Sequence, residues 1–107
     1  MDLSISSDVR DEVTLVHVGG EIDVYTAPVL RDHLDEHISQ GRHCLVVDLG
    51  GVTFMDSTGL RLVIRWDTAA KADGFEFAIV PGVEVVQRVF RLTGMDEHLQ
   101  VAEPPPE

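Results

Sequence analysis

The sequence predicts a single α/β domain in which helices cover a sheet that contains parallel strand pairs. Short apolar runs rich in β-branched residues alternate with longer segments of helical periodicity, in the order β-β-α-β-α-β-α-β. The chain has 107 residues, 44% of them apolar, which suits one compact core. We place the domain at residues 1–102 and expect the Pro-rich residues 103–107 to form an extended tail.

The first two strands are predicted to form a hairpin. Residues 3–6 alternate between apolar and polar side chains, and residues 8–12 are polar and turn-like. Residues 13–18 form a second apolar run, which we expect to end at the two glycines that follow. Two strands with a short polar connection favour antiparallel pairing.

The first helix is predicted to begin near Pro28 and to end at about Ser39. Thr26 is the expected N-cap, and a proline in the first turn lacks only an amide that has no partner there. Gly41 is the expected stop signal. Helical spacing predicts four buried residues, namely Val29, Leu30, Leu34 and Ile38.

The third strand and the second helix follow from the stretch after Cys44. Residues 44–47 are apolar and rich in β-branched residues, which predicts a strand buried on both faces. Residues 50–51 are glycines and predict a turn, after which a helix begins near Ser57 and ends near Gly74. The buried stripe of this helix is expected to contain Leu60, Val63 and Ile64.

The last elements are a strand over residues 75–80, a helix over residues 83–92 that Gly94 terminates, and a short final strand over residues 99–101. The helix is expected to bury some of its apolar residues, namely Val85, Val86, Val89 and Phe90.

Composition limits the possible partners. The formal net charge of −11, from 19 acidic and 8 basic side chains, repels nucleic acids and anionic membranes. A protein partner with a basic face, or solubility alone, explains this charge. Cys44 is the single cysteine, so no intramolecular disulfide can form. The sequence shows no signal-peptide pattern and no apolar run of the ~20 residues that span a bilayer, so we expect a soluble cytoplasmic protein.

Ser57 is the principal candidate site. A serine before an apolar-periodic segment is typical of an N-cap, which stabilises a helix by about 1 kcal/mol. The same junction exposes a hydroxyl near amides that favour an added phosphate, although Asp56 and Asp23 oppose the extra negative charge. Thr58 is a second possible acceptor, and Gly59 is expected to let the helix start pack closely on the sheet.

A second candidate surface lies farther along the same helix. Leu62 and Trp66 are four residues apart and offset from the predicted buried stripe. With Arg61 and Arg65 they can form an exposed apolar patch rimmed by positive charge, a composition enriched in protein interfaces. The alternative is that Trp66 covers the edge of the core and the arginines only solvate the helix.

Motifs for enzymatic chemistry are weak. His33 and His37 match the H-x-x-E-H pattern of inverted zinc proteases, but no third ligand has a recognisable spacing and the domain is too small. The sequence has neither a nucleophile elbow nor a phosphate-binding loop. We therefore expect no metal, no cofactor and no enzymatic activity.

Three segments in order resemble the STAS family, which includes bacterial anti-sigma factor antagonists and the tails of sulphate transporters. In chain order the segments are GEIDVYTAPVLR, VVDLGGVTFMDSTGL and VFRLTGMD, and the resemblance covers roughly residues 3 to 101. It implies a mixed sheet with the helices mainly on one face.

The antagonist subgroup also implies a phosphorylation switch. Ser57 matches the serine that an anti-sigma factor, itself a serine kinase, modifies, while Asp23 and Asp56 match acidic positions beside it. The unphosphorylated antagonist binds the kinase and releases the sigma factor, and a PP2C-type phosphatase resets the cycle. We expect a monomer or weak dimer. The alternative is a STAS scaffold subunit without a phospho-cycle, in which Ser57 is only a cap.

Overall fold

The computed structural model describes residues 2–102, so the predicted tail lies outside the described residues. Seven predicted elements are confirmed, and their observed bounds and order follow. They are β1 (Leu3–Arg10), β2 (Val13–Ile22), α1 (Ala27–Ser39), β3 (Cys44–Met55), α2 (Ser57–Asp73), β4 (Glu76–Val80) and α3 (Glu84–Thr93), after which comes the short 3-10 helix η1 (Met95–Glu97).

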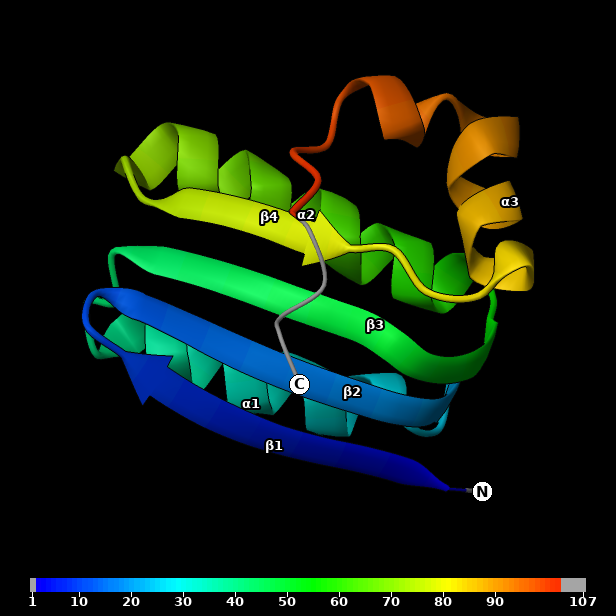
Figure 1. Ribbon diagram of the computed structural model, residues 1–107, viewed down its shortest axis with the longest axis horizontal. Helices are drawn as coiled ribbons and strands as arrows, with labels where there is room; N and C mark the ends of the chain where they lie inside the picture. Colours follow the sequence, from blue (N-terminus) through cyan, green and yellow to red (C-terminus); the bar gives the residue numbers. More distant parts are fainter. Residues whose placement is uncertain (1, 103–107) are drawn as a thin grey trace.

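The four strands form one mixed sheet in the order β1-β2-β3-β4. The β1–β2 hairpin is antiparallel, whereas β3 pairs in parallel with β2 and with β4. Both parallel pairs are joined through a helix, α1 or α2, and these two helices lie behind the sheet in Figure 1. The α3 helix stands at the end of the sheet where β3 finishes (Figure 1). The expected mixed sheet with helices mainly on one face is therefore confirmed.

Side-chain alternation decides which face of the sheet is covered. Leu45 and Val47 are fully buried, whereas Cys44 and Val46, which point to the other face, are only half-buried. The prediction that this strand is buried on both faces is wrong, because α1 and α2 pack on the same side. Burial raises the pKa of the Cys44 thiol, and the neighbouring Glu76 carboxylate raises it further.

The first three strands are longer than predicted, and in β2 and β3 this is because pairs of glycines do not end them. β1 continues to Arg10, and β2 and β3 run through their glycine pairs to Ile22 and Met55. Gly19 pairs with Gly51 across the two strands, beside shifts in the register. A Cβ on Gly51 would lie 3.1 Å from the Cα of Gly19. The glycines therefore allow the two strands to approach closely at a bulge.

The predicted helix ends are confirmed. Gly41, Gly74 and Gly94 all have positive φ angles of 75–78° next to the ends of α1, α2 and α3. Two details differ. Val29 was expected in the core but is 59% exposed. The predicted final strand over residues 99–101 is only a single parallel bridge between Val101 and Ile79.

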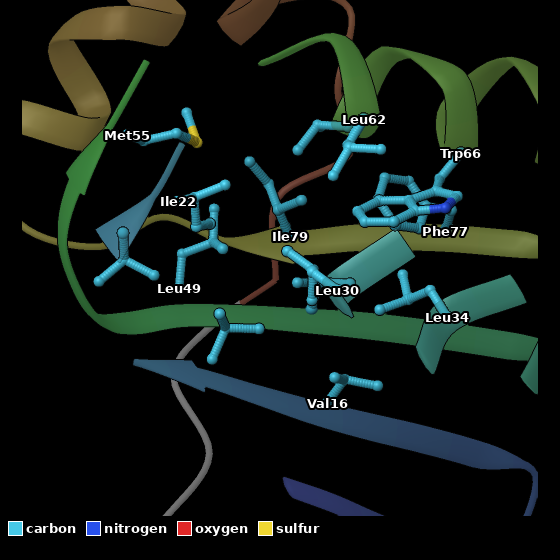
Figure 2. Close-up of a cluster of buried hydrophobic side chains, with 14 of the residues drawn as sticks. Val16, Ile22, Leu30, Leu34, Leu49, Met55, Leu62, Trp66, Phe77 and Ile79 are labelled. Atoms are coloured by element: carbon cyan, nitrogen blue, oxygen red, sulfur yellow. The ribbon is translucent and has the colours of Figure 1, made fainter. Parts of the chain in front are cut away.

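The core lies between the sheet and the first two helices. Trp66 of α2 packs against Phe77 of β4 with ring centroids 6.2 Å apart (Figure 2). Leu30 and Leu34 of α1 lie against the same cluster, and both are essentially inaccessible to solvent (Figure 2). This core fixes how far α2 is rotated about its axis, and so which of its residues reach solvent.

Candidate functional site

The N-cap of α2 lies one residue earlier than predicted. Asp56 is the N-cap, with an extended backbone (φ −103°, ψ −168°), and its Oδ1 accepts a hydrogen bond from the Thr58 amide at 2.8 Å. The prediction that Ser57 caps the helix is therefore wrong. Ser57 already has helical geometry, so the residue before it satisfies the free amide.

The Ser57 side chain is exposed at this junction. Its Oγ accepts a hydrogen bond from Arg61 Nη2 at 3.2 Å, and its carbonyl oxygen accepts one from Arg61 Nε at 3.4 Å. Thr58, the rival acceptor, is half-buried. The geometry therefore favours Ser57 over Thr58 as the more accessible hydroxyl.

The loop between β2 and α1 lies beside this turn. The Asp56 amide donates to the carbonyl oxygen of Ile22 at 3.3 Å, and Ile22 pairs with Met55. Asp23 follows directly, and its Oδ1 accepts hydrogen bonds from the amides of Tyr25 (2.9 Å) and Thr26 (3.0 Å). The carboxylates of Asp23 and Asp56 thus stabilise two adjacent loops at one edge of the sheet.

Thr26 occupies the N-cap position of α1, but its side chain makes no capping hydrogen bond. Its hydroxyl donates to the carbonyl oxygen of Glu21 at 2.7 Å and accepts from the Asp23 amide at 2.9 Å. The Thr26 side chain therefore stabilises the loop before α1 and not the first turn of the helix. The predicted capping hydrogen bond from Thr26 is absent.

Gly59 brings α2 close to the sheet, as expected. The residue is buried, and a Cβ there would lie 2.5 Å from Met55 Cγ and 2.9 Å from Ile22 Cγ2. The side chains of Ile22 and Met55 occupy the space beside it, and both belong to the buried cluster in Figure 2. The position of Ser57 relative to the neighbouring loop depends on this close packing.

Exposed apolar side chains surround the same edge of the sheet. Val24 and Tyr25, in the loop after β2, are 61% and 78% exposed. Phe54 near the end of β3 and Val83 after β4 are each nearly half exposed. Sequence reasoning missed this group because its members come from separate loops. The one signal available was the presence of apolar residues outside any periodic stripe.

The predicted apolar patch on α2 is not exposed. Leu62 is 9% and Trp66 1% exposed, because the helix turns these residues toward the sheet together with Val63. Arg61 and Arg65 do reach solvent, and Arg65 Nη2 donates to Asp35 Oδ2 of α1 at 3.1 Å. The alternative interpretation, in which Trp66 belongs to the core, is the one that the packing supports.

The two helical histidines connect α1 to the edge strand β1. His33 Nε2 and His37 Nε2 lie 2.6 Å and 2.9 Å from Ser7 Oγ. Partial burial lowers the pKa of His37, and the charge of His33 lowers it further. Within residues 2–102 no three metal-binding side chains lie together. The Ser7 contacts give this histidine pair a structural role.

No helix among residues 2–102 combines the length and apolar character needed to cross a bilayer.

Comparisons with known proteins agree on one family. A model of the STAS domain matches residues 4–104. An anti-sigma-B factor antagonist of Staphylococcus epidermidis is 36% identical over 103 residues, which cover 96% of this chain and 95% of that protein. A crystal structure of an anti-sigma factor antagonist from Mycobacterium paratuberculosis is 28% identical, with a TM-score of 0.80 over 97% of this chain and 87% of that one. Unphosphorylated SpoIIAA has the same fold, with a TM-score of 0.78 at 20% identity over 92% of this chain and 88% of that one.

Proposed function

The chain belongs to the STAS domain family, and from this premise we propose that it is an anti-sigma factor antagonist controlled by phosphorylation of Ser57. In its unphosphorylated form it binds an anti-sigma factor that is a serine kinase, and this binding releases a sigma factor. A PP2C-type phosphatase restores the unphosphorylated form. The protein acts by binding, not by catalysis, in the cytoplasm, where sigma factors work.

The observation that carries this proposal is the division of roles between Asp56 and Ser57. Asp56 satisfies the Thr58 amide, which leaves the exposed Ser57 hydroxyl free of any capping role. A kinase can therefore modify Ser57 without removing the cap of α2. A phosphate adds about −1.5 to −2 charges at neutral pH. Phosphorylation therefore changes the surface charge strongly and leaves the packing of the core nearly unchanged.

The exposed apolar group supplies a surface for the partner. Val24, Tyr25, Phe54 and Val83 come from the ends of β2, β3 and β4, the same end of the sheet at which α2 and Ser57 begin. Tyrosine is among the residues that contribute most at interfaces. The net charge of −11 favours a partner with a basic face. Among the helix residues predicted to contact the partner, Arg61 and Arg65 remain accessible.

A phosphate on Ser57 weakens such an interface in two ways. It must lose water when the partner covers it, and it adds negative charge beside Asp56. If these effects together cost about 3–4 kcal/mol, the affinity falls by roughly two to three orders of magnitude. That difference is enough to separate bound from free antagonist.

The test compares three baits with a matched control. Wild-type protein, Ser57→Ala, Ser57→Asp and Ser6→Asp are used to capture partners from a lysate of the source organism, and the affinity of the captured kinase is then measured by calorimetry. Ser6 is exposed on β1, on a separate element from α2, so Ser6→Asp adds the same charge elsewhere.

We expect wild type, Ser57→Ala and Ser6→Asp to bind a kinase that Ser57→Asp binds at least ~100-fold more weakly. The kinase should phosphorylate Ser57 in wild type and leave Ser57→Ala unmodified. Equal binding by all four proteins would refute the switch and favour a STAS scaffold. Phosphate found on Thr58 in place of Ser57 would refute Ser57 as the phosphorylation site.

A further inference from the structure

We propose that Arg61 is a positioning residue for the phosphorylated state, because its guanidinium is already placed to hold a phosphate on Ser57 against the exposed face of α2. This inference rests on the proposed function and concerns the regulation of the same site. It assigns to Arg61 a role toward the phosphate as well as toward the partner.

The contact between the two side chains exists before any phosphate is present. Arg61 lies one helical turn after Ser57, a spacing that makes side chains neighbours on a helix surface. One guanidinium nitrogen reaches Ser57 Oγ at 3.2 Å and another reaches the Ser57 carbonyl oxygen at 3.4 Å. Phosphorylation would attach three acceptor oxygens to the atom that Arg61 already contacts.

The chemistry of the two groups fits this arrangement. A guanidinium presents several N–H donors in one plane and binds phosphate oxygens in pairs. Arg61 can turn from the Ser57 hydroxyl to two phosphate oxygens without moving its backbone. Lysine at this position would offer a point charge but not the paired hydrogen bonds.

The charges around the site leave Arg61 available. Arg65, the other arginine on this part of α2, forms an ion pair with Asp35 at 3.1 Å. Within the described residues Arg61 has no carboxylate within ion-pair distance. The nearby Asp56 and Asp23 accept hydrogen bonds from backbone amides instead. Arg61 is therefore the cation at hand when negative charge is added to Ser57.

Two consequences follow for the phosphorylated protein. The guanidinium favours the dianionic phosphate over the monoanion, so it lowers the second pKa of the phosphate below the ordinary value of about 6. It also holds the phosphate along the outer face of α2, beside Arg61. In the phosphorylated state the phosphate and the Arg61 guanidinium then form an ion pair of defined geometry.

The experiment installs phosphoserine at position 57 during translation, so that no kinase is required. The phosphate is titrated by ³¹P NMR in the wild-type background and in Arg61→Gln, Arg61→Lys and Arg65→Gln backgrounds. Arg65→Gln is the matched control, because it removes the same charge one turn farther along α2.

We expect Arg61→Gln to raise the second pKa of the phosphate by about half a unit and Arg65→Gln to leave it nearly unchanged. Arg61→Lys should give an intermediate value. Identical titrations in wild type and Arg61→Gln, or equal shifts in both glutamine variants, would overturn the inference. Failure of the phosphoserine protein to show the thermal unfolding transition of the unmodified chain would overturn it as well.

The proposed function can fail separately. If the anti-sigma factor does not phosphorylate Ser57, the switch is refuted, while the titration of the installed phosphate still decides the role of Arg61.

Discussion

The two faces of α2 differ in burial: the inner face packs in the core, and the outer face is exposed to solvent. The inner face, which includes Leu62 and Trp66, is buried against the sheet and the first helix. The outer face presents Ser57, Arg61 and Arg65 to solvent. None of these residues belongs to both faces. Substitutions on the inner face should therefore change stability, whereas substitutions on the outer face should change binding.

The largest expected effect is on the inner face. Trp66→Ala should lower the free energy of unfolding by about 3–5 kcal/mol, because it leaves a cavity in the packed core. Chemical denaturation followed by circular dichroism measures this change.

Trp66→Phe is the matched control. The indole nitrogen of Trp66 is buried without a hydrogen-bond partner within residues 2–102, so its removal loses no such bond there. A phenyl ring keeps part of the packing on Phe77 and should cost clearly less than alanine. Stability unchanged in Trp66→Ala would contradict the division between the two faces.

The second effect concerns Asp56, the N-cap of the helix that carries both faces. Asp56→Ala should lower the free energy of unfolding by about 1 kcal/mol, because the Thr58 amide loses its acceptor. Asp56→Asn keeps a side-chain oxygen and should recover most of this loss. Thermal unfolding of the three proteins provides the comparison, and full stability of Asp56→Ala would show that the cap contributes nothing.

The smallest effect is expected on the outer face. Arg65→Gln removes an ion pair whose side chains are 55% and 38% exposed, so the loss should be at most about 0.5 kcal/mol. Denaturation at low and high salt measures it, and the difference should vanish at high salt. A double-mutant cycle with Asp35→Asn isolates the pair. A loss above ~2 kcal/mol would mean that the outer face also supports the fold.

Much of the fold could be predicted from short-range signals. The helix ends at Ser39, near Gly74 and near Gly94 follow from glycines that adopt positive φ angles. The strand ends could not be predicted in this way, because Gly19 and Gly51 meet across two strands that are far apart in sequence. A glycine that ends a strand and a glycine that admits a neighbour look the same in one sequence.

The exposed position of Ser57 at the start of α2 was predictable, but the cap that precedes it was not. Asp56 and Ser57 are both good capping residues, and the choice depends on where the strand before them ends. The predicted buried stripe of α2 and the observed one share Val63 and differ by a rotation of the helix about its axis. That rotation is set by Phe77 and the first helix, which lie elsewhere in the chain. Periodicity alone could not decide whether Trp66 faced solvent.

The cap formed by Asp56 has a consequence for how quickly a signal can act. Because Asp56 caps the first turn, a chemical change at Ser57 does not require the helix that follows to refold. Under the proposed switch, the domain would store a signal as a covalent change at one atom. Its response time would be set by the kinase and the phosphatase that reach that atom, and repeated cycles would involve no unfolding of the helix.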